Sequence, residues 1–427
     1  MQTYAQMTQE ELQQELIRLK ASYKEYQEKG LQLDMSRGKP SKEQLDMGMG
    51  LMNVLEPTDE MMAEDGTDTR NYGSVDGIPE AKRLMAEIMD VEPEQVIVCG
   101  NSSLNIMYDT VARAMLLGLL GETPWSKLDE VAFLCPVPGY DRHFAITEHF
   151  GIRMINVPMT EEGPDMDIVE ELVSKDASIK GIWCVPKYSN PQGVVYSDET
   201  VRRMAGLKPA AKDFRIFWDN AYAVHHLYGP EHGVMLNILE ECEKAGNPDM
   251  VFMFASTSKV SFAGAGISAL ASSAANLKEA KSCMTIQTIG YDKVNQLRHV
   301  RYFKDLAGIE AHMERHATLL RPRFEMVLSI LERELKDCGA GHWIKPMGGY
   351  FVTFEAVEGC ATRIVSLAKE AGVILTPAGA PFPYGKDPKD SVIRIAPSFP
   401  TMEELETATE IFALCAKIAT VEHTLNR

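Results

Sequence analysis

Short apolar runs alternate with amphipathic stretches through the middle of the chain, from about residue 75 to residue 290. The apolar runs include VIVC at 96–99, VAFLC at 131–135, IKGIWCV at 179–185 and MVFMFAS at 250–256. Continuous apolar runs of this kind are typical of strands that are buried on both faces of a parallel sheet. The stretches between them repeat their apolar residues with the period of a helix. This alternation predicts an α/β domain whose mainly parallel sheet is covered by helices.

The two ends of the chain follow different patterns. Near the N-terminus, Thr8 and Glu11 form the S/T-x-x-E signature of a helix start, and Gly30 marks the end of that helix. Residues 292–337 have helical periodicity, and Pro322 is expected either to begin a new helix there or to kink a long one. After them, the strand-like runs YFVTFEA and SVIRIAP alternate with helical segments. This pattern predicts a second, smaller α+β domain.

These patterns divide the chain into three parts. We expect an N-terminal segment at 1–54 that joins the small domain, a large domain at 55–300 and a small C-terminal domain at 301–427. The length of 427 residues is sufficient for two domains, each with a sizeable core.

Composition and charge exclude several classes of protein. Hydrophobic residues make up 45% and charged residues 24%, as in ordinary soluble proteins. The net charge of −18 argues against sequence-independent binding to nucleic acids or anionic membranes. No apolar run approaches the roughly 20 residues of a membrane helix, and the N-terminus does not resemble a secretory signal. Because the 8 cysteines are scattered without a C-x-x-C pair, we expect a reduced, cytoplasmic protein without a metal site.

Polar segments follow several predicted strands at their carboxyl ends, where parallel α/β sheets bind ligands. They are GNSS at 100–103, NPQG at 190–193, DNAY at 219–222 and STSK at 256–259. The first segment opens a predicted helix, so it is either an anion site or a plain helix cap. The second makes a β-turn whether or not it also binds a ligand.

Lys259 and Asp219 carry the most specific chemistry among these residues. A lysine among hydroxyls at a strand end is positioned to form a Schiff base with a carbonyl cofactor, although a surface lysine is the alternative. An acidic residue that ends a buried strand has few structural reasons to be there, and Asp219 can pair with a pyridinium nitrogen. Tyr222, three residues further on, can reach the phenolic oxygen of the same cofactor.

Two other motifs are weaker. GAGISA at 264–269 matches a dinucleotide-binding spacing, but it does not lie at the first strand-to-helix turn of a βαβ unit. His312 and His316 lie four residues apart on a predicted helix, and no third metal ligand is evident. We therefore expect neither a dinucleotide nor a metal ion.

Taken together, the strand-end motifs resemble those of the pyridoxal-phosphate-dependent class I/II aminotransferases, which have the large aspartate aminotransferase fold (fold type I). The segments SRGKP, GNSSL, PGYDRH, PKYSNPQG and TSKVSFAGAG are similar to the bacterial aspartate-aminotransferase-like subgroup. This resemblance spans nearly the whole chain. It implies pyridoxal 5'-phosphate as the cofactor, amino acids and 2-oxo acids as substrates, and a homodimer.

The resemblance also implies a role for each residue around the cofactor. Lys259 would bind the cofactor covalently and move a proton, Asp219 would pair with the pyridinium nitrogen, and Tyr222 would hydrogen-bond the phenolate oxygen. The other implied contacts are Asn190 at the phenolate oxygen, Tyr140 stacked on the ring, Ser102, Ser103, Ser256 and Ser258 at the phosphate, and Tyr72 at the phosphate from the neighbouring subunit.

One departure from the family concerns the phosphate. Family members usually carry an arginine in a G-x-R-x-G segment soon after the lysine, and this arginine pairs with the phosphate. Here the corresponding segment is GAGIS at 264–268, which contains no basic residue. The resemblance therefore leaves open which group replaces that arginine.

The resemblance implies that Arg394 binds the substrate α-carboxylate in a bidentate fork, with Gly38 close by. A dicarboxylic substrate needs a second cation, and Arg37 and Arg142 are the candidates. Lys39 and Lys187 are weaker candidates, since a lysine cannot make the planar fork. Alternatively, the two candidate arginines form structural bridges to Asp34 and Asp141, and the pocket then prefers apolar or aromatic substrates.

We interpret the chain as a transaminase that moves an amino group from an L-amino acid, preferably aspartate, to a 2-oxo acid, preferably 2-oxoglutarate. The alternatives are an aminotransferase for aromatic or alanine-like substrates, a pyridoxal-phosphate lyase or decarboxylase, and a non-catalytic ligand-sensing module. Decarboxylation is disfavoured because Arg394 would hold the carboxylate that must leave. A sensing module is disfavoured because Lys259, Asp219 and Tyr222 are all present.

Overall fold

The computed structural model describes residues 2–426, and its centre is an 8-stranded sheet in the order β2-β9-β8-β7-β6-β3-β4-β5. The strands are β2 (Val96–Cys99), β3 (Ala132–Val137), β4 (Arg153–Thr160), β5 (Gly163–Pro164), β6 (Ile179–Cys184), β7 (Arg215–Asp219), β8 (Val251–Ser256) and β9 (Ser268–Ala271). The pairs β4–β3, β3–β6, β6–β7 and β7–β8 are parallel. β9 runs antiparallel to both β8 and β2, and β5 is antiparallel to β4. The expected mainly parallel sheet is confirmed.

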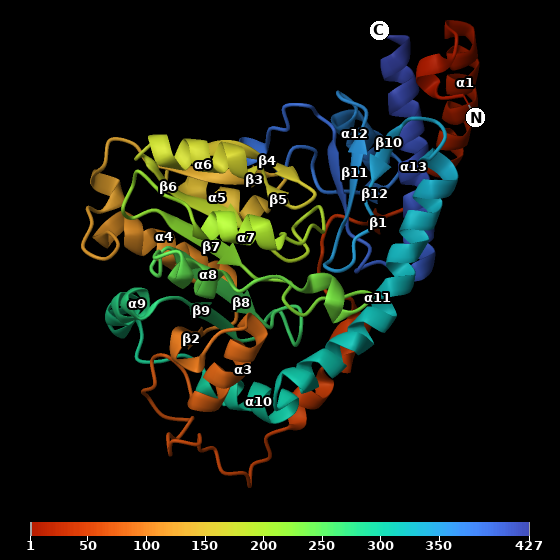
Figure 1. The fold of residues 1–427 in the computed structure, drawn as a ribbon. Helices are drawn as coiled ribbons and strands as arrows, with labels where there is room; N and C mark the ends of the chain where they lie inside the picture. The colour runs from red at the N-terminus through yellow and green to blue at the C-terminus, as the bar shows by residue number, and fades with distance from the viewer. Residues whose placement is uncertain (1, 427) are drawn as a thin grey trace.

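Helices cover both faces of this sheet (Figure 1). They are α3 (Pro79–Met89), α4 (Ser103–Leu117), α5 (Asp141–His149), α6 (Met166–Lys175), α7 (Asp198–Ala205), α8 (Ile238–Lys244) and α9 (Ala274–Gln287). The strands alternate their side chains between two apolar cores. Leu134 of β3 belongs to the core that includes residues of α3, α6, α7 and α8, whereas Phe133 belongs to the core that includes residues of α4, α5 and α9. Both cores exclude water, which explains why these strands are continuous apolar runs.

The second part of the chain is an α+β unit around a 3-stranded antiparallel sheet in the order β10-β11-β13. Its elements are β1 (Leu33–Asp34), β10 (Gly341–Trp343), β11 (Val352–Ala356), β12 (Val373–Ile374), β13 (Val392–Ile395), α12 (Ala361–Glu370) and α13 (Met402–Leu425). β1 pairs in parallel with β12, so the segment that follows the N-terminal helix lies against this unit. A separate apolar core fills it.

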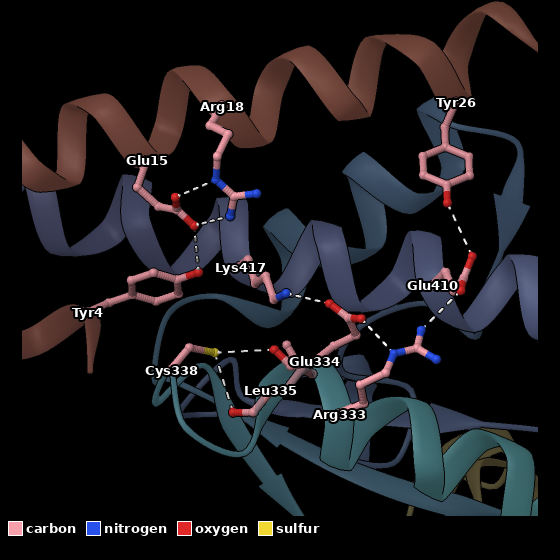
Figure 2. Close-up of polar contacts among 10 residues, drawn as sticks. All are labelled: Tyr4, Glu15, Arg18, Tyr26, Arg333, Glu334, Leu335, Cys338, Glu410 and Lys417. Carbon is pink, nitrogen blue, oxygen red and sulfur yellow. Dashed lines mark hydrogen bonds and ion pairs between the residues drawn. The ribbon is translucent and has the colours of Figure 1, made fainter. Parts of the chain in front are cut away.

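Two long helices, α1 (Gln9–Glu28) and α11 (Leu306–Leu335), both pack against α13, and α11 runs from there to the region of α10 (Lys293–Phe303) (Figure 1). Figure 2 shows the polar contacts between them. Lys417 of α13 donates to Glu334 of α11 at 2.6 Å, and Arg333 donates to Glu410 at 3.0 Å. Tyr26 of α1 donates to the same Glu410 at 3.3 Å. Because these groups are still partly exposed to water, we attribute most of the cohesion to the apolar residues of α1 that pack beneath them.

Two expectations about helix ends can now be judged. The capping box of Thr8 and Glu11 is present, and α1 begins directly after Thr8. Pro322 lies inside α11, so the helix does not restart there, and the first of the two alternatives for this proline is wrong. α10 (Lys293–Phe303) and the short α2 (Lys42–Met47) complete the helices of the chain from residue 2 to residue 426. Among these described residues no helix is both long and apolar enough to span a membrane.

Candidate active site

Parallel pairing brings the carboxyl ends of β6, β7 and β8 to one edge of the large sheet. Asp219 is the last residue of β7, and Lys259 lies in the turn that follows β8. Asn190 lies in the loop after β6, where its bond to Pro191 is cis. Ser103 begins α4 after β2, at the other side of β9. The chain therefore gathers at this edge the polar segments that the sequence singled out.

Asp219 is buried, with 2% of its surface exposed, and its two carboxylate oxygens differ. Oδ2 lies 2.9 Å from Nε2 of His143, whose ring stacks on Trp183 with centroids 4.5 Å apart. Oδ1 is buried and has no hydrogen-bond partner among residues 2–426. An unpaired buried carboxylate oxygen is costly, so this atom fits a cationic or hydrogen-donating group of a bound molecule. A protonated pyridine nitrogen is such a group.

His143 is a residue of the site that the sequence reasoning missed. It lies on α5, one turn after Tyr140, and their rings make an edge-to-face contact at 4.9 Å. The only signal in the sequence is this three-residue spacing inside PGYDRH. Its contact with Asp219 spans 76 residues, which no local pattern reveals.

Lys259 faces Tyr222: its Nζ atom lies 4.9 Å from the centroid of the tyrosine ring. Desolvation lowers the pKa of Lys259, and the charge of Asp219 opposes this shift. A lowered pKa increases the neutral fraction of the amine, which is the form that acts as a nucleophile or a base. Tyr222 itself is 2% exposed, and burial keeps the pKa of its hydroxyl well above its usual value.

Hydroxyl groups gather at the start of α4. Ser102 is the N-cap residue of this helix but makes no side-chain cap hydrogen bond, and Ser103 is its first residue. Ser258 donates to the carbonyl of Asn101 at 2.8 Å, and Ser256 lies 3.2 Å from Ser258. Free N–H groups, hydroxyls and the positive end of the helix dipole together suit a phosphate.

The loop after Lys259 is held by α10, which the sequence reasoning did not anticipate. Asn295 donates from Nδ2 to the carbonyls of Ala265 and Gly266 at 2.9 and 3.0 Å. His299 lies 2.8 Å from the Ser261 hydroxyl. These contacts fix the turn that carries the lysine.

Arg394 comes to the same edge from β13 of the smaller unit. Its Nη1 donates to Asn190 Oδ1 and to Asp141 Oδ1, both at 3.1 Å. The guanidinium lies over the ring of Phe351 at 4.7 Å. A Cβ atom at Gly38 would lie 2.4 Å from that ring, so a glycine is needed for the SRGKP segment to pack here.

Comparison with known proteins agrees with this arrangement. A family model described as aspartate amino-transferase matches residues 7–427. The chain belongs to this family. Its resemblance to aminotransferases is thereby confirmed, and the enzyme is a transaminase.

Individual relatives in this aminotransferase family cover the whole chain. An aspartate aminotransferase of Corynebacterium glutamicum is 46% identical over 409 residues, which are 96% of this chain and 94% of the relative. An aminotransferase of Mycolicibacterium smegmatis is 48% identical over 418 residues, with 97% and 96% covered. The crystal structure of an aspartate transaminase from C. glutamicum superposes with a TM-score of 0.96 at 45% identity and covers 99% of both chains.

The remaining candidates of this aminotransferase differ in position. Tyr140 is partly buried, and burial together with the charges of Asp219 and Asp141 raises its pKa to about 12. Tyr72 is 79% exposed. Arg37 and Arg142 are also exposed.

The structural bridges considered for the two arginines are not formed. Asp34 accepts from the Ser36 hydroxyl at 2.5 Å, and Asp141 pairs with Arg394 instead. Neither Arg37 nor Arg142 has an ion-pair partner within the chain from residue 2 to residue 426. Both arginines therefore keep their charge free for another group.

Buried histidines lie behind the lysine turn. His312 donates from Nε2 to the carbonyl of Val260 (2.9 Å), and its ring centroid lies 4.6 Å from that of His316. Burial lowers the pKa of His299 and His312 to about 4 and that of His316 to about 3. His225, beside Tyr222, has a pKa well below its usual value for the same reason.

These histidines predict that the enzyme loses stability in mild acid. Below pH 6.5 the unfolded chain binds protons that the folded chain excludes down to about pH 4, so stability is full above pH 6.5 and falls as the pH drops. Each such histidine contributes about 2 kcal/mol to the loss between pH 7 and pH 5. Denaturant unfolding at these two pH values measures it.

The variant His316→Asn should reduce this loss by about the same amount. His342→Asn is the control, because the side chain of His342 is 71% exposed and lies outside this buried group. Equal losses in wild type and His316→Asn would contradict the assignment.

Proposed function

We propose that this aminotransferase uses pyridoxal 5'-phosphate to move an amino group from an L-amino acid, preferably aspartate, to a 2-oxo acid, preferably 2-oxoglutarate. The observation that carries the proposal is the pair formed by Asp219 and Lys259 at the ends of neighbouring strands. Asp219 has a buried oxygen without a partner among the described residues, and Lys259 has a lowered pKa. An enzyme that binds a pyridinium ring and a carbonyl carbon needs both features.

The residues present fit this cofactor. Asp219 would hold the pyridine nitrogen, Tyr222 and Asn190 the phenolate oxygen, and Tyr140 the ring face. Ser102, Ser103, Ser256 and Ser258 would hold the phosphate. When bound, the cofactor supplies an electron sink for the negative charge that develops at the substrate Cα. His143 keeps Asp219 in position through its 2.9 Å contact and leaves the other oxygen free for the ring.

The amine of Lys259 would move the proton at the substrate Cα. Burial lowers its pKa, which increases the fraction of neutral amine that can accept a proton. The turn that carries it is held by Asn295 and His299, which limits the motion of the base. A well-positioned base accelerates a proton transfer far more than a mobile one.

Arg394 would bind the substrate α-carboxylate. Its guanidinium is held over Phe351 and beside Asn190, so its orientation is set before the substrate arrives. This position argues against the decarboxylase alternative, because a carboxylate held by an arginine is stabilised in the charged form that must be lost as CO₂.

The dicarboxylate preference rests on Arg37 and Arg142. Arg37 precedes Gly38, which packs against the ring beneath Arg394, and Arg142 follows Asp141, the ion-pair partner of Arg394. Both arginines are exposed. Lys39 and Lys187 have other contacts: Lys39 lies 3.8 Å from the Phe399 centroid, and Lys187 donates to the carbonyl of Ala223 at 3.3 Å.

We also propose a cytoplasmic homodimer, in which Tyr72 reaches the phosphate of the neighbouring subunit. The exposure of 79% of its surface in a single chain supports this role. The limits 1–54, 55–300 and 301–427 remain our proposal for the domains.

A spectroscopic experiment tests the proposed reaction. The absorption band of the bound cofactor should disappear when aspartate is added and return when 2-oxoglutarate is added. Borohydride treatment followed by peptide mapping should place the pyridoxyl group on Lys259, and Lys259→Ala should abolish turnover. A sensing module would show no such cycle, and a label on another lysine would contradict the mechanism.

Replacing Asp219 by Asn tests the proposed pairing with the pyridine nitrogen. The variant keeps the shape and removes the charge that stabilises the ring cation. We expect transition-state stabilisation to fall by about 3 kcal/mol, at least a hundredfold in kcat/KM. His143→Gln should lose less, since it removes one contact to Asp219 and leaves the carboxylate charge. An Asn variant with nearly unchanged turnover would refute the pairing.

Substrate choice is tested with Arg37→Leu, Arg142→Leu and Lys39→Leu as the control. Removing the arginine that binds the distal carboxylate should reduce kcat/KM for aspartate by about 2–4 kcal/mol, roughly 30- to 1,000-fold. Activity with alanine should stay almost constant, because alanine has no distal carboxylate. If neither arginine variant changes the aspartate-to-alanine ratio, the dicarboxylate pocket lies elsewhere or does not exist.

A further inference from the structure

Arg394 already has a carboxylate partner inside the chain. Its Nη1 atom donates to Asp141 Oδ1 at 3.1 Å, and the two side chains are 9% and 36% exposed. This contact joins the start of α5 in the large unit to β13 of the smaller unit. It is the one ion pair of Arg394 among residues 2–426.

Few N–H groups of the Arg394 guanidinium remain available to a ligand. Nε is buried without a partner among the described residues, and Nη2 makes only a long contact of 3.4 Å with Thr376. A carboxylate binds an arginine best through two parallel N–H groups. Because Nε is inaccessible, an incoming carboxylate must use Nη1 and Nη2, and Asp141 already occupies Nη1.

Asp141 can leave this position more readily than Asn190, the other acceptor at Nη1. Asn190 is only 5% exposed. Asp141 is the first residue of α5, and its carboxylate makes no further side-chain hydrogen bond within the described chain. Away from Arg394 it would remain at a helix N-terminus, where a negative charge is favoured, and beside the exposed Arg142.

We propose that Asp141 is a resident competitor for the substrate carboxylate, which must displace it from Arg394. The proposal rests on the function proposed above, since it takes Arg394 as the carboxylate site. The exchange replaces one carboxylate by another, so the charge of the buried arginine stays balanced in both states.

The competitor makes the site selective. A carboxylate can bind only to those molecules in which Asp141 has left Arg394. Its apparent affinity is therefore the intrinsic affinity multiplied by the fraction of such molecules. A small anion with a single contact competes poorly against a carboxylate tethered beside the arginine. A substrate that is also held at a second point gains additional binding free energy, which offsets the free energy of displacing Asp141. Asp141 thus determines specificity by rejecting simple carboxylates.

Calorimetric titration of the holoenzyme with succinate tests this proposal. Succinate has two carboxylates but no amino group, so binding is measured without turnover. We expect Asp141→Asn to bind succinate about three- to tenfold more tightly than wild type, because the competing charge is gone. Asp141→Ala should gain at least as much, since it also removes the oxygen that an asparagine could still offer to Arg394.

Glu148→Gln is the matched control. Glu148 is exposed on the same helix, and its replacement removes the same charge without touching Arg394. Equal tightening in Glu148→Gln and Asp141→Asn would show a general charge effect and overturn the proposal. Weaker succinate binding in both Asp141 variants, at unchanged melting temperature, would overturn it as well, since Asp141 would then be supporting Arg394.

Arg394→Leu separates this inference from the proposed function. If Arg394 is the carboxylate site, the variant loses at least 30-fold in succinate affinity whatever Asp141 does. Retained binding in Arg394→Leu would contradict the proposed carboxylate site itself. Loss of binding in Arg394→Leu without tightening in the Asp141 variants would leave the proposed function in place and refute the competitor.

Discussion

Parallel pairing of β6, β7 and β8 aligns the ends of three strands, and the candidate site depends on this alignment. Trp218 pairs with Cys184 on one side, and Asp219 pairs with Phe254 on the other. A shift of the register by one residue would turn Asp219 toward the opposite face of the sheet. The apolar residues on both faces fix the register, so the two cores of the large unit also determine where the carboxylate lies.

The site holds several charged groups away from water, and none of them has a complete set of partners. Asp219 has His143 at one oxygen and nothing at the other among the described residues. Arg394 has Asp141 and Asn190 at Nη1 but only a long contact of 3.4 Å with Thr376 at Nη2. Lys259 faces a tyrosine ring and forms no ion pair among the described residues, although the charge of Asp219 acts on it. Buried polar atoms elsewhere in the described chain also lack partners, but here three charged groups with incomplete partners lie together, which is typical of a site that completes its contacts on binding a ligand.

Local patterns in the sequence predict a large part of this architecture. The strands are recognisable as apolar runs, and the capping box of Thr8 is evident from the four residues that end at Glu11. The antiparallel direction of β9 cannot be predicted in this way, because an apolar run carries no information on strand direction. Pro322 is tolerated inside α11, since the packing of a long helix outweighs one missing hydrogen bond.

The same distinction applies to the site. Asp219 ends one apolar strand run and Lys259 closely follows another, so the sequence pattern identifies them as candidate site residues. His143 and Asn295 support them from helices far away in the chain, and Asp141 meets Arg394 across 253 residues. Such partners are selected by the three-dimensional packing, so only the structure identifies them.

The segment after Lys259 lacks the basic residue that the resemblance leads us to expect near the cofactor phosphate. Ile267, inside the segment where the resemblance to class I/II aminotransferases leads us to expect an arginine, is 1% exposed and belongs to the core. A charged side chain at that position would need a counter-charge, and the apolar Ile267 provides no positive charge for a phosphate. The phosphate of the proposed cofactor would therefore be held by the hydroxyls and N–H groups at the start of α4, whose dipole supplies part of the missing positive charge. With less charge on the phosphate side, retention of the cofactor depends more on Asp219 and on the covalent bond to Lys259.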